Sequence, residues 1–194
     1  MQEIIWKIIF IIMGICSSMI RLPHMKKYRK TEKIKSRKTS RENFLVFLAT
    51  VGMMIVPMIY VFTPWLDSFS MSLPDWARWV GVAASGYGLI LFWQVHKTLG
   101  KNWSPVLEIR KNHNLITEGP YKYIRHPMYT QMWIGAICHG LITSNWIVGI
   151  VAFLTWSLLY FIRMPEEEKM MVEEFGQEYK DYMKRTKKII PGVY

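Results

Sequence analysis

The sequence has little of what a disulfide-stabilised or nucleotide-binding soluble protein needs. Among 194 residues there are only two cysteines, Cys16 and Cys138, and each lies within an apolar stretch, so we expect buried thiols and no disulfide. No Gly-x-Gly-x-x-Gly, Gly-x-Ser-x-Gly or phosphate-binding loop occurs, and internal repeats and low-complexity linkers are missing. These absences exclude a soluble-type nucleotide site and a second, soluble domain.

Long apolar blocks dominate what is present. About 20 apolar residues, at a rise of 1.5 Å each, cross a hydrocarbon core of roughly 30 Å. The sequence therefore predicts an all-α integral membrane protein with about five transmembrane helices, the last two joined in a tight hairpin by residues 143–145. The predicted spans are Ile4–Ile20, Phe44–Thr63, Trp76–Val95, the short Met128–Ile142, and Trp146–Ile162.

The basic residues are distributed unevenly between the blocks. The net charge is +11, and 23 of the 25 Lys and Arg residues fall within Arg21–Arg41, Lys97–Arg125 and Arg163–Lys188. The other two connections between apolar blocks, 64–75 and 143–145, contain no Lys or Arg. This positive-inside pattern places the N-terminus outside and the C-terminus in the cytoplasm. Attraction to anionic membrane lipids explains the charge, so we expect no nucleic-acid partner.

Two features of the predicted spans indicate how they pack. Pro57 should kink the second span and free a backbone carbonyl. Small residues recur at helical spacing in the third span, which favours close contact with a neighbouring helix. These residues are Gly81, Ala84, Ser85 and Gly88.

Two polar clusters on the predicted inner side are the candidates for chemistry. The first, His113–Tyr129, is aromatic, polar and rich in turn formers, and it leads directly into an apolar block. The second contains Arg163 and Glu167, which share a helix face if the helix continues through Pro165. A charged pair at the membrane end of a helix favours a functional site, although an interfacial salt bridge has the same spacing.

The remaining acidic and histidine residues of this region indicate less. We expect Glu166, Glu168, Glu173 and Glu174 to form a solvated face. No cysteine or second closely spaced histidine supports His113 and His126 as metal ligands, so no metal site is expected. The tail carries Phe175, Tyr179 and Tyr182 at helical spacing, which predicts an amphipathic helix that lies on the membrane or folds over the site.

In this order the motifs resemble the isoprenylcysteine carboxyl methyltransferase family. They are Gly119-Pro120-Tyr121-x-Tyr123-x-Arg125-His126-Pro127-x-Tyr129, an apolar hairpin, Arg163-x-Pro165-Glu166-Glu167, and Phe175-Gly176-x-x-Tyr179-x-x-Tyr182. The resemblance covers roughly residues 95–194, whereas residues 1–94 match only as membrane helices. We therefore expect a single membrane domain, 1–194, with a three-helix N-terminal part (1–94) and a catalytic, cofactor-binding part (95–194).

The resemblance implies an S-adenosylmethionine-dependent enzyme that esterifies the carboxylate of a prenyl-type, lipid-modified cysteine and releases S-adenosylhomocysteine. Arg163 matches the position that meets the acceptor carboxylate, and Arg163 and Glu167 are the implied catalytic pair. The inner connecting segment and the C-terminal amphipathic helix would form the cofactor site at the cytoplasmic surface. The implied cofactor-binding residues are His113, Asn114, Leu115, Ile116, Tyr121, His126, Pro127, Met128, Tyr129 and Glu167.

The chemistry of these residue types agrees with that expectation. A carboxylate that attacks a sulfonium methyl group needs orientation and little water, but no base. The planar fork of Arg163 suits a carboxylate. The alternatives are a phospholipid or other lipid amine methyltransferase, a membrane sterol-type reductase, and a non-enzymatic scaffold. The lipid chain of the acceptor would enter sideways from the bilayer.

Overall fold

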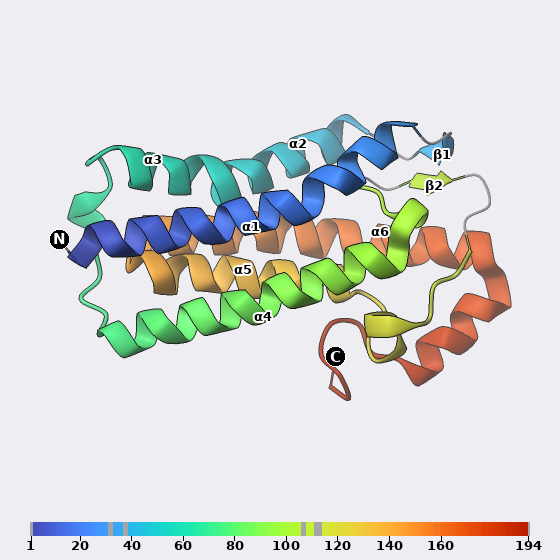
Figure 1. Cartoon of the computed structure of the whole chain (residues 1–194). Helices are drawn as coiled ribbons and strands as arrows, with labels where there is room; N and C mark the ends of the chain where they lie inside the picture. The colour runs from blue at the N-terminus through green and yellow to red at the C-terminus, as the bar shows by residue number, and fades with distance from the viewer. Residues whose placement is uncertain (1, 31–32, 37–38, 106–107, 111–113, 194) are drawn as a thin grey trace.

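Long helices arranged as a bundle make up the computed structural model, which describes residues 2–30, 33–36, 39–105, 108–110 and 114–193 (Figure 1). Three short 3-10 turns, η2 (Asp67–Phe69), η3 (Gly100–Asn102) and η4 (Gly119–Lys122), lie in the connections. Residues 40–62 form one continuous helical segment that contains a π-helical turn. The main elements are α1 (Gln2–Lys30), α2 (Ser40–Thr50), η1 (Val51–Ile55), α3 (Val56–Phe62), α4 (Asp75–Leu99), α5 (Pro127–Thr143) and α6 (Trp146–Arg185).

Three of the described helical segments are long and apolar enough to cross a membrane. They are Gln2–Tyr28, Ser40–Phe62 and the helix Trp146–Arg185. Helix α5 has 17 residues, so it is about 26 Å long at 1.5 Å per residue. The all-helical membrane architecture is thus confirmed, whereas the count of five crossings stays a prediction.

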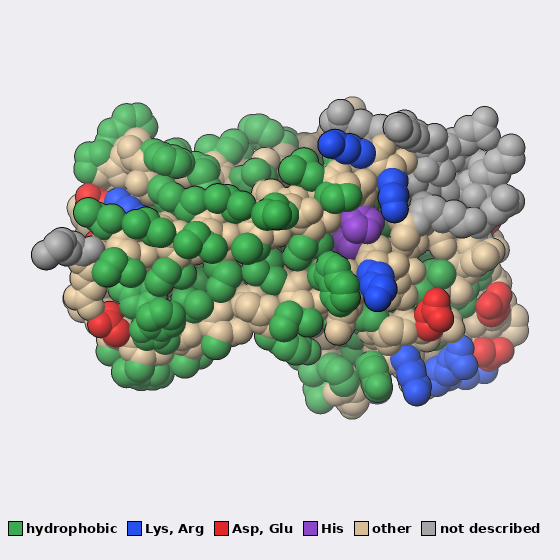
Figure 2. All heavy atoms as spheres, viewed as in Figure 1, with side chains coloured by type: hydrophobic (Ala, Val, Ile, Leu, Met, Phe, Trp, Pro, Cys, Tyr) green, Lys and Arg blue, Asp and Glu red, His purple; other side chains and the backbone are tan. Residues whose placement is uncertain are grey.

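The outer surface of the bundle is apolar, as a lipid-facing surface must be. Along α1, Ile8, Ile12 and Ile15 are each about half exposed although they lie in the middle of the helix. Figure 2 shows hydrophobic side chains along most of this face, while charged side chains gather toward its ends. A soluble protein rarely leaves so large a contiguous apolar surface in water. The chain is an integral membrane protein.

The kink expected at Pro57 is accommodated by η1. A proline has no N–H, so the carbonyl four residues earlier, that of Met53, loses its helical partner. His139 on α5 lies with Nε2 at 3.2 Å from this oxygen, and it donates to it in the tautomer protonated on Nε2. The π turn contains Met53, and Nε2 of His139 is within hydrogen-bond range of the carbonyl that the proline deprives of its helical donor.

Glycines bring α4, α5 and α6 into close contact. A Cβ on Gly81 would lie 2.9 Å from Cβ of Leu141, and one on Gly88 would lie 3.3 Å from Cγ2 of Ile134. In the α5–α6 hairpin, a Cβ on Gly140 would lie 3.0 Å from Cα of Gly149. The small-residue face predicted for the third span is confirmed as a packing surface between α4 and α5.

The hairpin turn is also tied to the loop that precedes α4. Ser144 adopts the left-handed conformation with φ of 48°. Asn145 caps α6 by accepting from the backbone N–H of Val148 at 3.2 Å, and its amide donates to the carbonyl of Leu66 at 2.7 Å. The backbone N–H of Met71 donates to the carbonyl of Ser144 at 2.6 Å. The tight hairpin predicted from the three-residue join is confirmed.

Three features of the fold differ from the sequence-based expectation or extend it. Strands β1 (Lys33–Ser36) and β2 (Glu108–Arg110) pair antiparallel in a small ribbon. Their sequences are short and polar, and the pairing arises because the two connections run side by side (Figure 1). Helix α1 continues through Pro23 into the basic segment, and α6 continues through Pro165, because a single proline removes only one helical hydrogen bond.

Candidate active site

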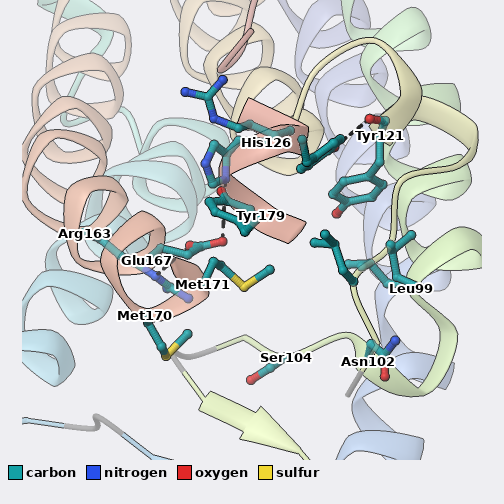
Figure 3. Close-up of a pocket in the computed structure, with 14 residues that line it drawn as sticks. Leu99, Asn102, Ser104, Tyr121, His126, Arg163, Glu167, Met170, Met171 and Tyr179 are labelled. Atoms are coloured by element: carbon teal, nitrogen blue, oxygen red, sulfur yellow. Dashed lines mark hydrogen bonds and ion pairs between the residues drawn. The ribbon is translucent and has the colours of Figure 1, made fainter. Parts of the chain in front are cut away.

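A cavity opens at the end of the bundle opposite the N-terminus, between the connection that precedes α5 and the second half of α6. Met171 and Tyr179 face Leu99 and Tyr121 across it (Figure 3). The end of α4, the connection between α4 and α5, and helix α6 therefore build the cavity. The side chains that line it belong to Leu99, Asn102, Ser104, Leu115, Ile116, Tyr121, Arg125, His126, Arg163, Glu167, Met170, Met171, Tyr179 and Tyr182.

Six of the predicted site residues line this cavity: Leu115, Ile116, Tyr121, His126, Arg163 and Glu167. The other predicted residues that the structure describes do not line it. Met128 packs behind Tyr121 beside Leu91 and Val95, while Pro127 begins α5, where a proline costs no helical hydrogen bond. Asn114 is exposed. His113 lies outside the described residues.

Glu167 is held by residues from two helices. The Tyr129 hydroxyl on α5 donates to Oε2 of Glu167 at 2.7 Å. On the same helix as Glu167, Arg163 places Nε at 4.0 Å from Oε2, the i,i+4 relation expected from the sequence. Tyr129 is therefore a support for the carboxylate rather than part of the cavity lining.

His126 lies between two carboxylates. Its Nδ1 is 3.7 Å from Oε1 of Glu167, and its Nε2 is 3.3 Å from Oε1 of Glu168. Burial by itself would lower the pKa of His126, but the hydrogen bonds and charges of the two glutamates outweigh it and raise the pKa above its ordinary value. The geometry therefore favours an imidazolium that carries a positive charge into the site.

Arg163 is a largely buried cation with few hydrogen bonds. Its Nη1 donates to the carbonyl oxygen of Pro105 at 3.1 Å. Its Nε is buried and has no hydrogen-bond partner among the described residues. Glu42 from α2 approaches with Oε1 at 3.9 Å from Nη1, which is ion-pair range but beyond hydrogen-bond range.

Glu168 is not the solvated residue that the sequence suggested. Its side chain is 13% exposed, and it accepts from Nε of Arg125 at 2.6 Å. Nζ of Lys188 lies 3.5 Å from its other oxygen. The error arose because Arg125 and Lys188 are far from Glu168 along the chain, so helical spacing could not reveal them.

The C-terminal part of α6 folds back over the cavity. Gly176 has φ of 54°, a conformation that favours glycine, and the helix axis bends there. Tyr182 then donates from its hydroxyl to the carbonyl of Tyr121 at 2.6 Å, and the Arg125 and His126 backbone N–H groups donate to the carbonyls of Lys187 and Lys188. Of the two expected positions for the tail, folding over the site is the observed one.

Sequence reasoning missed part of the lining. Met170 and Met171 follow Glu167 by three and four residues on α6, so helical periodicity could have placed them beside it. Leu99, Asn102 and Ser104 had no comparable signal, because they lie at the end of α4 and in the turn after it.

Residues 81–173 match the isoprenylcysteine carboxyl methyltransferase (ICMT) family, and this segment contains His126, Arg163 and Glu167. Over this segment the chain resembles members of that family. It is 32% identical over 139 residues to the protein-S-isoprenylcysteine O-methyltransferase of Dictyostelium discoideum, a match that covers 70% of the chain and 55% of that protein.

Two further comparisons extend this result. The chain is 24% identical over 155 residues to the nickel-cobalt-cadmium resistance protein NccN of Alcaligenes xylosoxydans xylosoxydans, covering 79% of the chain and 67% of that protein. The structure of the eukaryotic intramembrane Ras methyltransferase ICMT superposes with a TM-score of 0.56 at 24% identity, covering 81% of this chain and 54% of that one. This likeness shows the fold. The chain spans about half the length of the ICMT relatives.

Proposed function

We propose that the protein transfers a methyl group from S-adenosylmethionine to the carboxylate of a lipid-modified, prenyl-type cysteine at the membrane–cytosol interface. The observation that carries this proposal is Arg163, a buried guanidinium whose Nε has no hydrogen-bond partner among the described residues. An arginine fork is the side chain best suited to hold a carboxylate through two hydrogen bonds. The name of the Dictyostelium relative supports the same acceptor.

The residues around the cavity fit the proposed cofactor. Glu167 offers an acceptor for an ammonium or ribose hydroxyl group, and the buried Tyr179 hydroxyl has no hydrogen-bond partner among the described residues. Leu99, Leu115 and Ile116 supply apolar surface on the opposite side. Tyr121 and His126 complete the set of predicted cofactor residues that line the cavity, while Tyr129 supports Glu167 from behind.

When bound, S-adenosylmethionine supplies an electrophilic methyl group on a sulfonium sulfur. An acceptor carboxylate oxygen forms a bond to this carbon as the carbon–sulfur bond breaks, and the electron pair stays with sulfur. A negative and a positive charge are lost together, so no base is required. The residues of this chain contribute orientation and exclusion of water: Arg163 holds the carboxylate, Glu167 orients the cofactor, and the tail helix covers the cavity.

The location of the cavity suits two substrates of different polarity. It lies at the end of the bundle where Arg125, Arg163 and the tail gather, and the distribution of Lys and Arg along the sequence favours the cytoplasmic side for this end. The cofactor would enter from the cytosol and the lipid chain from the bilayer, while the N-terminus would lie outside. Anionic lipids would contact the basic connections. In this proposal residues 1–194 form one membrane domain, with 95–194 as its catalytic part.

The experiment that tests the proposal uses purified protein in lipid nanodiscs. Labelled methyl from S-adenosylmethionine is offered to a farnesylcysteine analogue, and methyl ester is measured as methanol released by base. Release that depends on Arg163 and Glu167 is the expected result. A base-stable labelled lipid would instead identify an amine acceptor, and a folded protein that fails to bind the cofactor would favour the reductase alternative.

A further inference from the structure

Glu42 belongs to the N-terminal half of the chain, outside the segment that matches the family, yet it reaches the site. It lies in the first turn of α2 and is only 6% exposed. Its backbone N–H donates to Oγ1 of Thr39, the N-cap of the helix, at 3.1 Å. The cap fixes the start of α2 and with it the position of the Glu42 side chain in the first turn.

Glu42 and Glu167 lie close to Arg163 without occupying its donors. The closest N–O separations are 3.9 Å from Oε1 of Glu42 to Nη1 and 4.0 Å from Oε2 of Glu167 to Nε. Both are longer than a hydrogen bond. The two carboxylates therefore attract the guanidinium from two helices, while its Nε keeps a donor that no described residue uses.

We propose that Glu42 is a positioning residue that holds the Arg163 fork between α2 and α6, so that its donors stay directed to the acceptor carboxylate. The inference rests on the proposed function, because it assigns a cause to the orientation of the arginine that would bind the acceptor. Charge is the property that matters. A neutral side chain at position 42 would leave Glu167 as the nearest described carboxylate, and the guanidinium would turn toward it and away from the acceptor.

The chain offers variants that separate charge from packing. Glu42→Gln keeps the size and removes the charge, whereas Glu42→Asp keeps the charge and removes a methylene. If charge positions Arg163, Asp is the better replacement; if Glu42 only fills buried space, Gln is the better one. Glu166→Gln is the matched control, because Glu166 is half exposed and its ion pair with Arg41, at 3.3 Å, lies on the surface.

The test measures kcat and KM for methyl-ester formation with the farnesylcysteine analogue. In parallel, it measures the affinity for farnesylthioacetate, a non-esterified carboxylate probe, in the presence of S-adenosylhomocysteine. We expect Glu42→Gln to lower kcat/KM for the acceptor by about tenfold to a hundredfold, the scale of a displaced positioning group. Affinity for farnesylthioacetate should fall with it. Glu42→Asp should recover much of the loss, and Glu166→Gln should match the unmodified protein.

The outcomes distinguish this inference from the proposed function. If the unmodified protein forms methyl ester and Glu42→Gln is at least as active as Glu42→Asp, the positioning role is overturned and the proposed function stands. If the unmodified protein neither forms ester nor binds farnesylthioacetate, the proposed function fails, and the inference fails with it. Thermal unfolding of each variant shows whether a loss comes from misfolding, which would also overturn the positioning role if it accounted for the whole effect.

Discussion

The two ends of the bundle each contain a buried arginine, and the two are held in opposite ways. At the end near the N-terminus, Arg78 is 3% exposed and forms a two-pronged ion pair with Glu3, with nitrogen–oxygen distances of 2.6 and 3.1 Å. Its Nε donates to the carbonyl of Ile142 at 3.0 Å, and the guanidinium lies 4.4 Å from the ring centre of Trp6. All three nitrogens of its fork are in use.

Arg163, at the other end, is attracted by two carboxylates, but neither of them forms a hydrogen bond with its guanidinium. Its carboxylate neighbours lie at 3.9 and 4.0 Å, and only Nη1 has a hydrogen bond among the described residues, to Pro105. Leaving a buried donor unpaired costs roughly 1–3 kcal/mol. Such a cost is expected where a ligand later supplies the partner. The comparison indicates that Arg78 joins helices, whereas Arg163 is arranged to bind.

The largest expected effect comes from the same substitution at the two arginines. Arg163→Lys keeps the charge but loses the fork, and we expect methyl transfer to fall by about a hundredfold, the scale for removing one preorganised donor. Its thermal unfolding should stay close to that of the unmodified protein. Arg78→Lys should show the reverse: a lower unfolding temperature with nearly normal turnover of the folded fraction. Radiolabel transfer and thermal unfolding, measured together, check both.

Two results would contradict this contrast between Arg78 and Arg163. If Arg163→Lys kept normal turnover, Arg163 would have no part in binding the acceptor. If both variants lost stability equally and turnover followed stability, the two arginines would play the same structural part.

Glu3→Gln tests only the end near the N-terminus, where all three nitrogens of the Arg78 guanidinium have partners. It leaves the Arg78 fork with a neutral partner, and we expect a loss of about 2 kcal/mol in the free energy of unfolding, the scale for hydrogen bonds to a charged group. Because the site lies at the far end of the bundle, S-adenosylhomocysteine affinity should not change. Denaturant unfolding in mild detergent and calorimetric binding give the two values. Weakened cofactor binding without a stability loss would show that the two ends are coupled.

The sequence predicted the charged pair at the cavity, Arg163 and Glu167, and not the pair near the N-terminus, Glu3 and Arg78, for a physical reason. Arg163 and Glu167 are one helical turn apart, so the 3.6-residue period places them together without any tertiary information. Glu3 and Arg78 are 75 residues apart, and only the packing of α1 on α4 brings them into contact. Glu42 was missed for the same reason. The apolar helices could be predicted because bilayer thickness fixes the length of an apolar block, and three of them are long and apolar enough to cross a membrane.

Two further expectations failed because contacts between residues distant along the chain decided the structure. Glu168 was expected in water because glutamates in a charged run are mostly solvated, yet Arg125 and His126 cover it. The β1–β2 ribbon was missed because segments of four and three residues, each with one isoleucine among polar residues, are too short to give a periodic signal. In each case a tertiary contact outweighed the local preference.

A smaller effect is expected from pH at the cavity, where His126 lies between Glu167 and Glu168. Its pKa is raised in the folded protein, so the charged form contributes stability that is fully present below its unfolded pKa of about 6.5. That contribution is lost as the pH rises through the raised folded value. We expect the unfolding temperature to decline over the interval between these two pKa values, and His126→Gln to remove the decline. Glu168→Gln should shift it to lower pH, because one of the two carboxylates that raise the pKa is gone.

The smallest effects are expected at two chain reversals with positive φ, which lie at opposite ends of the bundle. Gly176, with φ of 54°, bends α6 so that Tyr179 and Tyr182 cover the cavity, and a Cβ there would meet no atom within 4 Å. Gly176→Ala should therefore cost only the backbone strain of an L-residue in the left-handed region, about 1 kcal/mol. That cost falls on the covering segment alone, so S-adenosylhomocysteine should bind about fivefold more weakly while the unfolding temperature of the bundle changes little. Ser144→Gly, at the reversal between α5 and α6 with φ of 48°, is the matched change in the other direction. It relieves strain but removes the serine hydroxyl that donates to the Met71 carbonyl, and it should leave cofactor affinity unchanged. Equal binding by the Gly176→Ala variant and the unmodified protein would mean that the tail helix does not close over the cofactor.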